Sequence, residues 1–352
     1  MFLMSSFLKL YTQKDIASFT RKRGSETKLG EKVKTITNFP EDLHTSSAKF
    51  VLLGLPEDIG VRANYGRGGT HTAWQPALES ILSIQNNLFL NGEELIVLGH
   101  INFDDVMKKA ESLTQKTKDT IEYLRKLVEF IDARVCEIVK LIVAAGKVPI
   151  IIGGGHNNSY PNIKGASEGL RVLNKIQRKG INVINCDPHA DFRPLEGRHS
   201  GNGFSYAFEE NSLIKYAVLA LHESYNSENV LTKFANDREN LLYTTFEESF
   251  ITETKTYTEA MNECISFCSD NFCGVELDLD AITNVPSSAK TSSGLSPTQA
   301  RQYVYNAAKK LKVCYFHIAE GAPVLAHIKA DNKTGKLIAY LVADFIKGYT
   351  KK

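Results

Sequence analysis

The feature that most constrains the fold of this chain is a series of short apolar runs separated by stretches of helical periodicity. The runs cover residues 49–55, 94–99, 147–154, 181–186, 216–221, 272–279 and 313–319. None of them alternates apolar with polar residues, so each predicted strand is covered on both faces, as in a parallel sheet flanked by helices. We therefore expect an α/β fold of three layers (α/β/α) around a central, mostly parallel, doubly wound sheet.

Helical patterns fill the intervals between these runs. Residues 119–147 repeat apolar residues at steps of three and four, which predicts a long helix with one buried face. Residues 296–312 begin with Ser296, a preferred N-cap residue, and Pro297 stands at the first helical position. A last helix is predicted over residues 335–348.

The composition excludes several classes of protein. Of the 352 residues, 43% are hydrophobic and 23% are charged, which is typical of a soluble globular protein with a substantial core. A net charge of +2 offers little electrostatic attraction to nucleic acid or to an acidic membrane. Because no apolar run is long enough to span a bilayer, we expect a cytoplasmic protein with neither nucleic acid nor a membrane as partner.

The first segment and the cysteines carry weaker signals. Residues 1–45 are polar, and we expect them to form a solvated, partly helical extension before one domain over residues 46–352. Three of the six cysteines, Cys264, Cys268 and Cys273, have a spacing that fits no common zinc pattern. We expect them to be buried, reduced thiols.

Acidic and histidine side chains follow four of the predicted strands. They are His156, Asp187, His189, Asp191, Asp278, Asp280 and Glu320. The carboxyl ends of parallel strands meet at the same edge of a sheet, where ligands bind in open α/β folds. The spacing of two residues within the D-x-H-x-D and D-x-D motifs aims their side chains the same way if the backbone stays extended. The sequence therefore predicts one site at this edge.

Five carboxylates crowded at a partly buried edge repel one another, and cations among them would remove the conflict. Carboxylates with two imidazoles and no thiolate favour a hard or borderline metal such as Mn²⁺. Six ligands suffice for two ions only if some of the carboxylates bridge the two. Such a pair of ions could activate water as a nucleophile. Taken singly, the acids could cap a helix and the glycines before His156 could cradle a phosphate. All three motifs in this order favour a binuclear metal site.

The motifs "GGGHNNS", "DPHADFRP" with "HSGN", and "ELDLDAI" resemble those of the ureohydrolase superfamily, which includes arginase, agmatinase and formimidoylglutamase. The resemblance covers roughly residues 48–348. It implies an arginase-like catalytic domain over 46–352, two Mn²⁺ ions per chain and assembly into homo-oligomers. It assigns one ion to His156, Asp187, Asp191 and Asp278. It assigns the other ion to Asp187, His189, Asp278 and Asp280.

Four positions depart from the superfamily pattern. Gly155 replaces an aspartate beside the histidine ligand, and Pro188 replaces an alanine. Arg193 stands where arginase-like enzymes have an asparagine that helps to bind the substrate, and Phe204 stands where arginase has a catalytic histidine. The D-x-R arrangement that ends in Arg193 and the early stretch 60–67 resemble formimidoylglutamase instead.

This resemblance implies a hydrolase of a linear amidine C–N bond, which would convert N-formimidoyl-L-glutamate to L-glutamate and formamide in histidine degradation. Catalytic roles fall to Asp191, which would pass a proton to the departing nitrogen, and to Glu320, which would hold the cationic amidine. Arg193 could clamp one of the two substrate carboxylates bidentately. The expected substrate contacts are completed by Ser200 and Asn202.

Alternatives stay open at this stage. The chain could instead release urea from a guanidino substrate such as arginine or agmatine, or it could be a non-catalytic binding protein, although its complete ligand set argues against the latter. Arg193 has a structural alternative, an ion pair with Glu196. His317 lies inside its predicted strand and is expected to be a satisfied core histidine. Substrate contact and structural roles are both open for Arg62, Arg67, His222 and Glu223.

Overall fold

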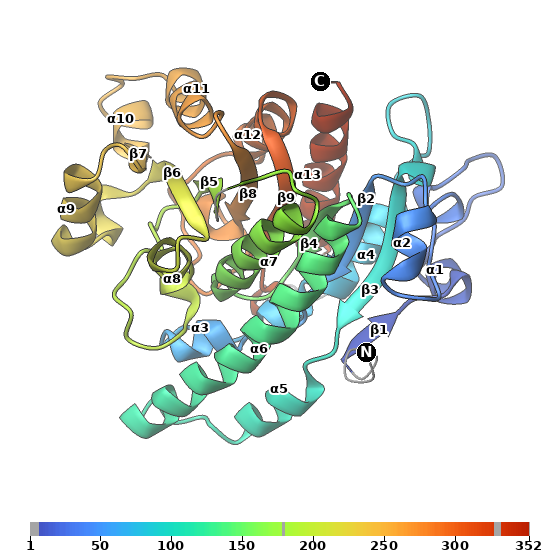
Figure 1. The fold of residues 1–352 in the computed structure, drawn as a ribbon, viewed down its shortest axis with the longest axis horizontal. Helices are drawn as coiled ribbons and strands as arrows, with labels where there is room; N and C mark the ends of the chain where they lie inside the picture. Colours follow the sequence, from blue (N-terminus) through green and yellow to red (C-terminus); the bar gives the residue numbers. More distant parts are fainter. Residues whose placement is uncertain (1–6, 178–179, 327–331, 352) are drawn as a thin grey trace.

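The computed structural model describes residues 7–177, 180–326 and 332–351, and a nine-stranded sheet lies at its centre between layers of helices (Figure 1). The order of the strands across the sheet is β1-β3-β2-β4-β9-β8-β5-β6-β7. Every neighbouring pair is parallel except β1 with β3. The expected three-layer α/β/α fold with a mostly parallel sheet is confirmed.

The seven predicted strands are all present. The strands are β1 (Leu8–Leu10), β2 (Phe50–Gly54), β3 (Leu95–Ile101), β4 (Val148–Ile152), β5 (Ile181–Cys186), β6 (Leu213–Leu221), β7 (Leu241–Thr245), β8 (Phe272–Asp278) and β9 (Lys312–Ala319). The sequence did not indicate β1 and β7, which lie at the two edges of the sheet. β1 has only three residues, and β7 is half-buried at Leu242 and Tyr243, so neither carries the apolar run of a strand that is covered on both faces.

The segment before residue 46 was expected to be a solvated, partly helical extension. The part that the structure describes is partly helical, at Gln13–Phe19 and Glu41–Thr45, but it is not a solvated extension. Its residues 8–10 pair with β3 and extend the sheet. The side chains of Ile16 and Leu29 are buried in the same core as β2 and β3. This first segment is therefore packed onto the edge of the sheet.

Three helices match their predicted positions. The helices are α1 (Gln13–Phe19), α2 (Glu41–Thr45), α3 (Ile59–Ala63), α4 (Trp74–Leu82), α5 (Asp104–Glu111), α6 (Lys118–Ala144), α7 (Ser159–Val172), α8 (Gly203–Glu209), α9 (Glu228–Asn236), α10 (Phe246–Phe250), α11 (Tyr257–Phe267), α12 (Pro297–Lys310) and α13 (Lys333–Thr350). Ser296 caps α12, because its hydroxyl accepts from the Gln299 N–H at 3.2 Å. No helix within the described ranges is both long and apolar enough to cross a membrane.

Each face of the sheet carries its own hydrophobic core. Side chains of α4, α11, α12 and α13 build the core on one face, and those of α6 and α7 build the core on the other. Strands β4 and β5 are therefore buried along their whole length, which explains why neither alternates apolar with exposed polar residues. The two asparagines of β5, Asn182 and Asn185, are buried and donate hydrogen bonds to Asp270 and Tyr216. Because both faces are covered, polar side chains can reach solvent or a ligand mainly at the ends of the strands. Strands β4, β9, β8 and β5 are consecutive in the sheet, so the segments that follow them lie together.

A buried ion pair ties α6 to the loops at this edge of the sheet. Arg198 is 3% exposed, and its Nε lies 2.9 Å from Asp132 Oδ2 on α6. Its guanidinium also donates to the carbonyl of Asn157 at 2.7 Å and to Asn202 Oδ1 at 2.8 Å. The ring of Tyr160 packs against the guanidinium with its centroid 4.7 Å away. One cation therefore holds two neighbouring loops to a helix.

Removal of the Arg198 guanidinium should destabilise the folded protein. We expect Arg198→Met to lower the free energy of unfolding by about 3–5 kcal/mol, because Asp132 is left as an unpaired buried charge. The double variant Asp132→Leu/Arg198→Met removes both charges and should recover most of that loss. Urea unfolding of both variants and wild type measures the difference. Equal midpoints for the single variant and wild type would contradict this account of the loops.

Candidate metal centre

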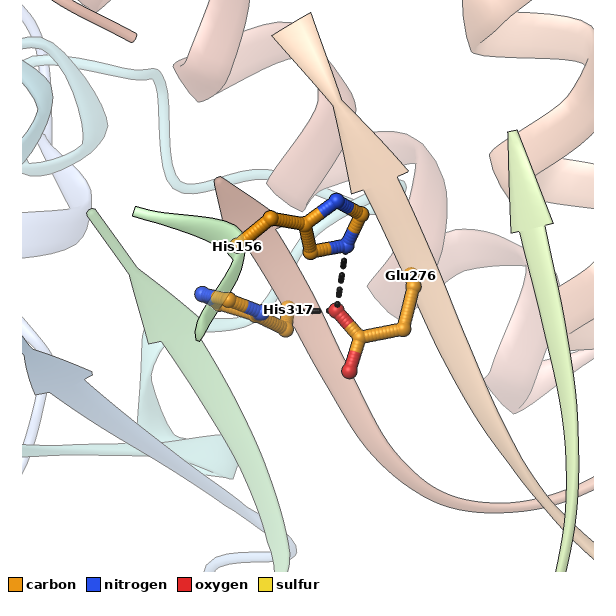
Figure 2. A group of neighbouring side chains, drawn as sticks. All are labelled: His156, Glu276 and His317. Atoms are coloured by element: carbon orange, nitrogen blue, oxygen red, sulfur yellow. Dashed lines mark hydrogen bonds and ion pairs between the residues drawn. The ribbon is translucent and has the colours of Figure 1, made fainter. Parts of the chain in front are cut away.

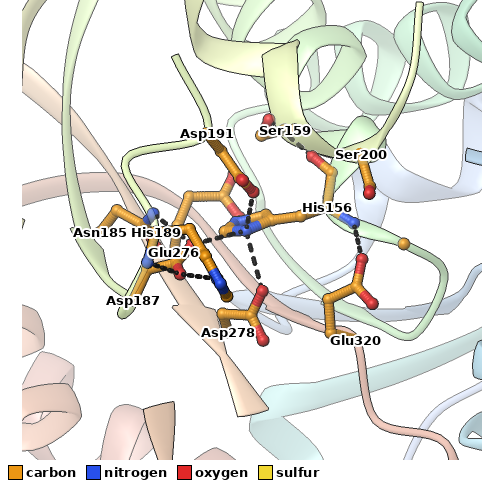
Figure 3. Close-up of polar contacts among 12 residues, drawn as sticks. His156, Ser159, Asn185, Asp187, His189, Asp191, Ser200, Glu276, Asp278 and Glu320 are labelled. Carbon is orange, nitrogen blue, oxygen red and sulfur yellow. Dashed lines mark hydrogen bonds and ion pairs between the residues drawn. The ribbon is translucent and has the colours of Figure 1, made fainter. Parts of the chain in front are cut away.

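Seven polar side chains meet at the edge of the sheet where β4, β9, β8 and β5 end (Figure 3). They come from the turn η5 (His156–Asn158), the loop after β5, the end of β8, the turn η8 (Leu279–Ala281) and the residue after β9. The set is His156, Asp187, His189, Asp191, Asp278, Asp280 and Glu320. All seven positions that the sequence singled out are therefore brought together.

His156 is the centre of the first group of possible metal ligands. Its Nδ1 lies 3.0 Å from Asp187 Oδ2, 3.0 Å from Asp191 Oδ2 and 3.3 Å from Asp278 Oδ2. The ring is fully buried, and neither of its nitrogens makes a hydrogen bond within the described parts of the chain. A buried nitrogen that points among three carboxylates without a hydrogen bond fits the ligand shell of a cation.

His189 marks a second group. Its Nδ1 lies 3.3 Å from Asp187 Oδ1 and 3.5 Å from Asp280 Oδ2, and Asp280 Oδ1 is buried without a hydrogen-bond partner among the described residues. Asp187 belongs to both groups through different oxygens, as a bridging carboxylate does. The geometry places Asp278 with the first group only, whereas the family resemblance assigns it to both ions. These oxygen-rich groups suit a hard or borderline divalent ion.

Tight turns, not an extended backbone, aim these side chains. Asp187 Oδ1 accepts from the His189 N–H at 2.7 Å, and Asp278 Oδ1 accepts from the Asp280 N–H at 2.8 Å. Asp191 itself has a φ of 46°, in the left-handed region that non-glycine residues rarely adopt. The expected extended backbone with a period of two is therefore wrong after β5. Strain of this kind is often kept at functional sites.

The electrostatics of the cluster show why cations are needed. Burial, together with Asp278 and Asp187, raises the pKa of Asp280 well above its usual value. Burial and the neighbouring Asp187 raise the pKa of Asp191 to about 6. Burial alone would lower the pKa of His189, but Asp187, Asp191 and Asp278 together outweigh it and raise that pKa to about 9. Burial opposes the ionised form of Asp187, yet the imidazoles of His156 and His189 hold its pKa below the usual value. Without metal ions, protons on the histidines and on some of the carboxyls therefore offset the crowded negative charge.

The cluster opens into a cavity of about 650 Å³. Glu320, Asp191 and Asp280 line it from the cluster side. Glu320 is 6% exposed, and its Oε1 accepts from the His156 N–H at 2.9 Å, so this carboxylate is held in place. Burial, with Asp278 close by, raises the pKa of Glu320 well above its usual value. A small polar molecule inside the cavity can therefore contact these carboxylates.

The predicted substrate residues differ in their access to the cavity. Arg193 and Ser200 line it. Asn202 does not line it, because its side chain is fully buried and its amide is bonded to Arg198, Pro194 and Gly197. The amide of Asn202 thus shapes the loop from behind.

Arg193 has internal partners in this structure. Its guanidinium donates to Asn64 Oδ1 at 2.7 Å and to Glu196 Oε1 at 3.0 Å, and 47% of its side chain is exposed. Glu196 Oε1 also lies 3.4 Å from the Arg125 guanidinium and 3.1 Å from His199 Nε2. The ion pair weighed from the sequence is therefore present, at the wall of the cavity.

Two further residues shape the cavity that sequence reasoning had not named. Asn64 joins Arg193 to Ser200, since its Nδ2 donates to Ser200 Oγ at 3.3 Å. Tyr225 also lines the cavity and stacks on the His189 ring, with centroids 5.7 Å apart. Asn64 lies within the noted stretch 60–67, whereas no spacing or motif in the sequence indicates Tyr225.

The structure shows the contacts of Phe204 and of the residues for which the sequence left substrate contact and structural roles open. Phe204 is fully buried, stacks on Tyr216 at 4.3 Å and does not line the cavity. Arg62 donates to two backbone carbonyls of the 110–113 segment, which gives it a structural role. His222 is 6% exposed and stacks on Phe246 at 4.6 Å. Two others also bond within the protein, Arg67 to the Ser288 carbonyl and Glu223 to the Thr245 hydroxyl.

A comparison with known proteins identifies relatives along most of the chain. The model of the arginase family matches residues 48–347. Formimidoylglutamase from Streptococcus pyogenes serotype M12 is 25% identical over 304 residues, which are 83% of this chain and 82% of the relative. The same identity and coverage hold for the formimidoylglutamase of serotype M18 of that species.

Solved structures share the fold. Formiminoglutamase from Trypanosoma cruzi with Mn²⁺ has a TM-score of 0.68 at 22% identity and covers 93% of this chain and 99% of its own. Formimidoylglutamase from Bacillus subtilis subsp. subtilis str. 168 has a TM-score of 0.71 at 18% identity and covers 94% of each chain. Proclavaminate amidino hydrolase from Streptomyces clavuligerus has a TM-score of 0.66 at 15% identity, with 95% and 99% covered.

The crowding of carboxylates predicts a pH dependence in the metal-free protein. A carboxyl with a raised pKa holds its proton more tightly in the folded than in the unfolded chain, so stability falls as the pH rises from the unfolded pKa through the folded one. We expect the Tm of metal-free wild type to fall between pH 5 and 8, and the Tm of metal-free Asp280→Asn to fall less. Calorimetry after dialysis against a chelator measures both.

Asp119→Asn is the matched control for this experiment, since Asp119 is exposed in the first turn of α6. It should follow the pH dependence of wild type. Added Mn²⁺ should raise the Tm of wild type more than that of Asp280→Asn, because ligand binding to the folded state stabilises it. Identical profiles for metal-free wild type and Asp280→Asn would show that these carboxylates are not crowded.

Proposed function

Because the chain belongs to the arginase family, and is accordingly a hydrolase of C–N bonds in linear amidines, we propose that it is a binuclear manganese enzyme that converts N-formimidoyl-L-glutamate to L-glutamate and formamide. One observation carries the proposal. A metal-ligand cluster and the guanidinium of Arg193 face the same cavity. A substrate with a reactive amidine at one end and carboxylates at the other matches both.

Two ions are supported by the two groups of ligands and by the shared Asp187. Manganese is supported by the oxygen-rich donors and by the Trypanosoma cruzi formiminoglutamase, whose structure contains Mn²⁺. When bound, such a pair of ions polarises the amidine and activates water for attack on its carbon. His156, Asp187, Asp191 and Asp278 would hold one ion. Asp187, His189 and Asp280 would hold the other, with Asp278 as the further ligand that the family pattern implies.

The protein's own groups would hold and protonate the substrate. Glu320 is fixed by the His156 N–H and presents its carboxylate to the cavity, where it can accept charge-assisted hydrogen bonds from the amidinium. Asp191 lies between the cluster and the cavity, and it can carry a proton to the departing glutamate nitrogen. The burial of both groups keeps bulk water from competing for these bonds.

Arg193 would recognise the far end of the substrate. A substrate carboxylate can replace Glu196 as the acceptor of the Arg193 guanidinium, while Arg125 and His199 continue to hold Glu196. Ser200 lies beside Arg193 in the cavity wall and can add a hydrogen bond to the same carboxylate. Hydrogen bonds to a charged group contribute about 1.5–3 kcal/mol. The buried amide of Asn202 is left out of this proposed contact.

The preference for substrates with carboxylates gives the first test. With Mn²⁺ at saturation, we expect kcat/KM for formimidoylglutamate to exceed that for arginine and for agmatine by at least about tenfold, the factor that 1.4 kcal/mol represents. Agmatine has no carboxylate for Arg193 to bind. The assay scores formamide, urea and ammonia separately. Faster turnover of arginine, with release of urea, would replace this proposal with a guanidino hydrolase.

A pair of variants tests the role of Arg193. Arg193→Asn should raise KM for formimidoylglutamate while kcat changes little, because the contact is remote from the reacting carbon and is made equally in the ground and transition states. Glu196→Gln keeps the guanidinium and weakens its internal partner, so it should lower KM or leave it unchanged. Steady-state kinetics of wild type and of the two variants measures KM and kcat for formimidoylglutamate. An unchanged KM in Arg193→Asn would remove Arg193 from the substrate site.

A further inference from the structure

We infer that a buried pair beneath the candidate metal centre, Glu276 with His317, positions His156 as a metal ligand by binding its far ring nitrogen (Figure 2). The inference rests on the metal centre of the proposed function and adds positioning residues to it. Glu276 lies on β8 and His317 on β9, directly opposite each other in the register of the sheet. Both side chains are fully buried.

Two hydrogen bonds hold the ring of His317. Its Nδ1 lies 2.6 Å from Glu276 Oε2, and its Nε2 lies 3.2 Å from the carbonyl oxygen of Gly153. A carbonyl only accepts, so Nε2 carries a hydrogen, and one further proton lies between Nδ1 and Glu276 Oε2. The other oxygen of Glu276 accepts from the Tyr315 hydroxyl at 2.8 Å. Both ring nitrogens of His317 therefore have hydrogen-bond partners, as expected for a core histidine. One of these partners, Glu276, also lies beside His156 of the metal centre.

The shared oxygen of Glu276 also faces His156. His156 Nε2 lies 3.5 Å from Glu276 Oε2, while Nδ1 points among the carboxylates of the first ligand group. A neutral imidazole that binds a metal through Nδ1 carries its hydrogen on Nε2. Glu276 Oε2, 3.5 Å away, is the carboxylate oxygen that faces this nitrogen, and it would accept that hydrogen in the metal-bound protein. Such carboxylate–histidine–metal arrangements fix the tautomer and orientation of the ligand.

The hydrogen bond to His317 explains how a carboxylate can be kept here. An unpaired Glu276 would add one more negative charge beneath four clustered aspartates, and its burial would be unfavourable. The proton that Glu276 and His317 share in a hydrogen bond of 2.6 Å offsets that charge within the pair. The pair can therefore orient His156 without making the metal centre more negative.

His156, Glu276 and His317 are also close enough together to be considered as ligands of a third ion. The contact geometry argues against it. Two donors on one ion, each about 2.1 Å from the metal, lie about 3 Å or more apart. The distance of 2.6 Å between His317 Nδ1 and Glu276 Oε2 is that of a charge-assisted hydrogen bond.

Metal titration of Glu276→Gln tests the inference. Calorimetric titration with Mn²⁺ should show two ions for wild type. In Glu276→Gln the ion at the His156 group should bind about 10–100-fold more weakly, while the other ion keeps its affinity. Electron paramagnetic resonance should then show isolated Mn²⁺ in place of a coupled pair at limiting metal. Tyr315→Phe removes only the hydrogen bond to the other oxygen of Glu276 and should keep both affinities.

A double variant separates positioning from general damage. If Glu276 acts through His156, Glu276→Gln should weaken binding no further in a His156→Ala background. Glu276→Gln/His317→Gln leaves no unpaired buried charge, so it keeps the test possible if the single variant does not fold. This double variant should also bind the ion at the His156 group more weakly than wild type does.

Three results would overturn the inference: unchanged affinities in Glu276→Gln, a further loss in the His156→Ala background, or a third ion in wild type. Absence of two ions from wild type would instead overturn the proposed function, and this inference with it.

Discussion

The mutual repulsion of buried carboxylates is the constraint on which the rest of this structure depends. Four aspartates and Glu320 share one edge of the sheet, and burial raises the pKa of several of them. Two histidines lie among these acids, with one carboxylate, Asp187, close to both. Groups that repel so strongly stay together only where cations or protons offset their charge. The cluster therefore has the charge and the donor atoms expected of a site for metal ions.

The fold supplies the means of holding such a cluster. Helices cover both faces of the sheet, so polar side chains gather where parallel strands end. Four neighbouring strands end beside one another, and tight turns at Asp187 and Asp278 redirect the chain there. Behind the cluster, Arg198 ties two loops to α6, and Glu276 with His317 supports His156. The wall of the cavity at Arg193 is more exposed than the cluster.

The clustered acids and histidines could be located from sequence because metal binding demands their residue types at motif spacings after apolar strands. The strands β1 and β7 could not, since both lie at an edge, β1 has only three residues, and β7 is half-buried at Leu242 and Tyr243. A motif position also does not say which way a side chain faces. Phe204 stands where a catalytic histidine was considered, yet it packs in the core, and the amide of Asn202 is bonded inside its loop. The ion pair of Arg193 with Glu196, three residues along the chain, was weighed from the sequence, whereas Asn64 became a partner of Arg193 only through a tertiary contact.

The most direct test of the central claim is the manganese content of wild type and of Asp187→Ala after dialysis against Mn²⁺, measured by plasma mass spectrometry. Wild type should hold close to two ions per chain. Asp187→Ala should lose most of both, because Asp187 belongs to both ligand groups. Metal-free wild type, or an Asp187→Ala protein that still holds two ions, would contradict the account of a shared binuclear centre.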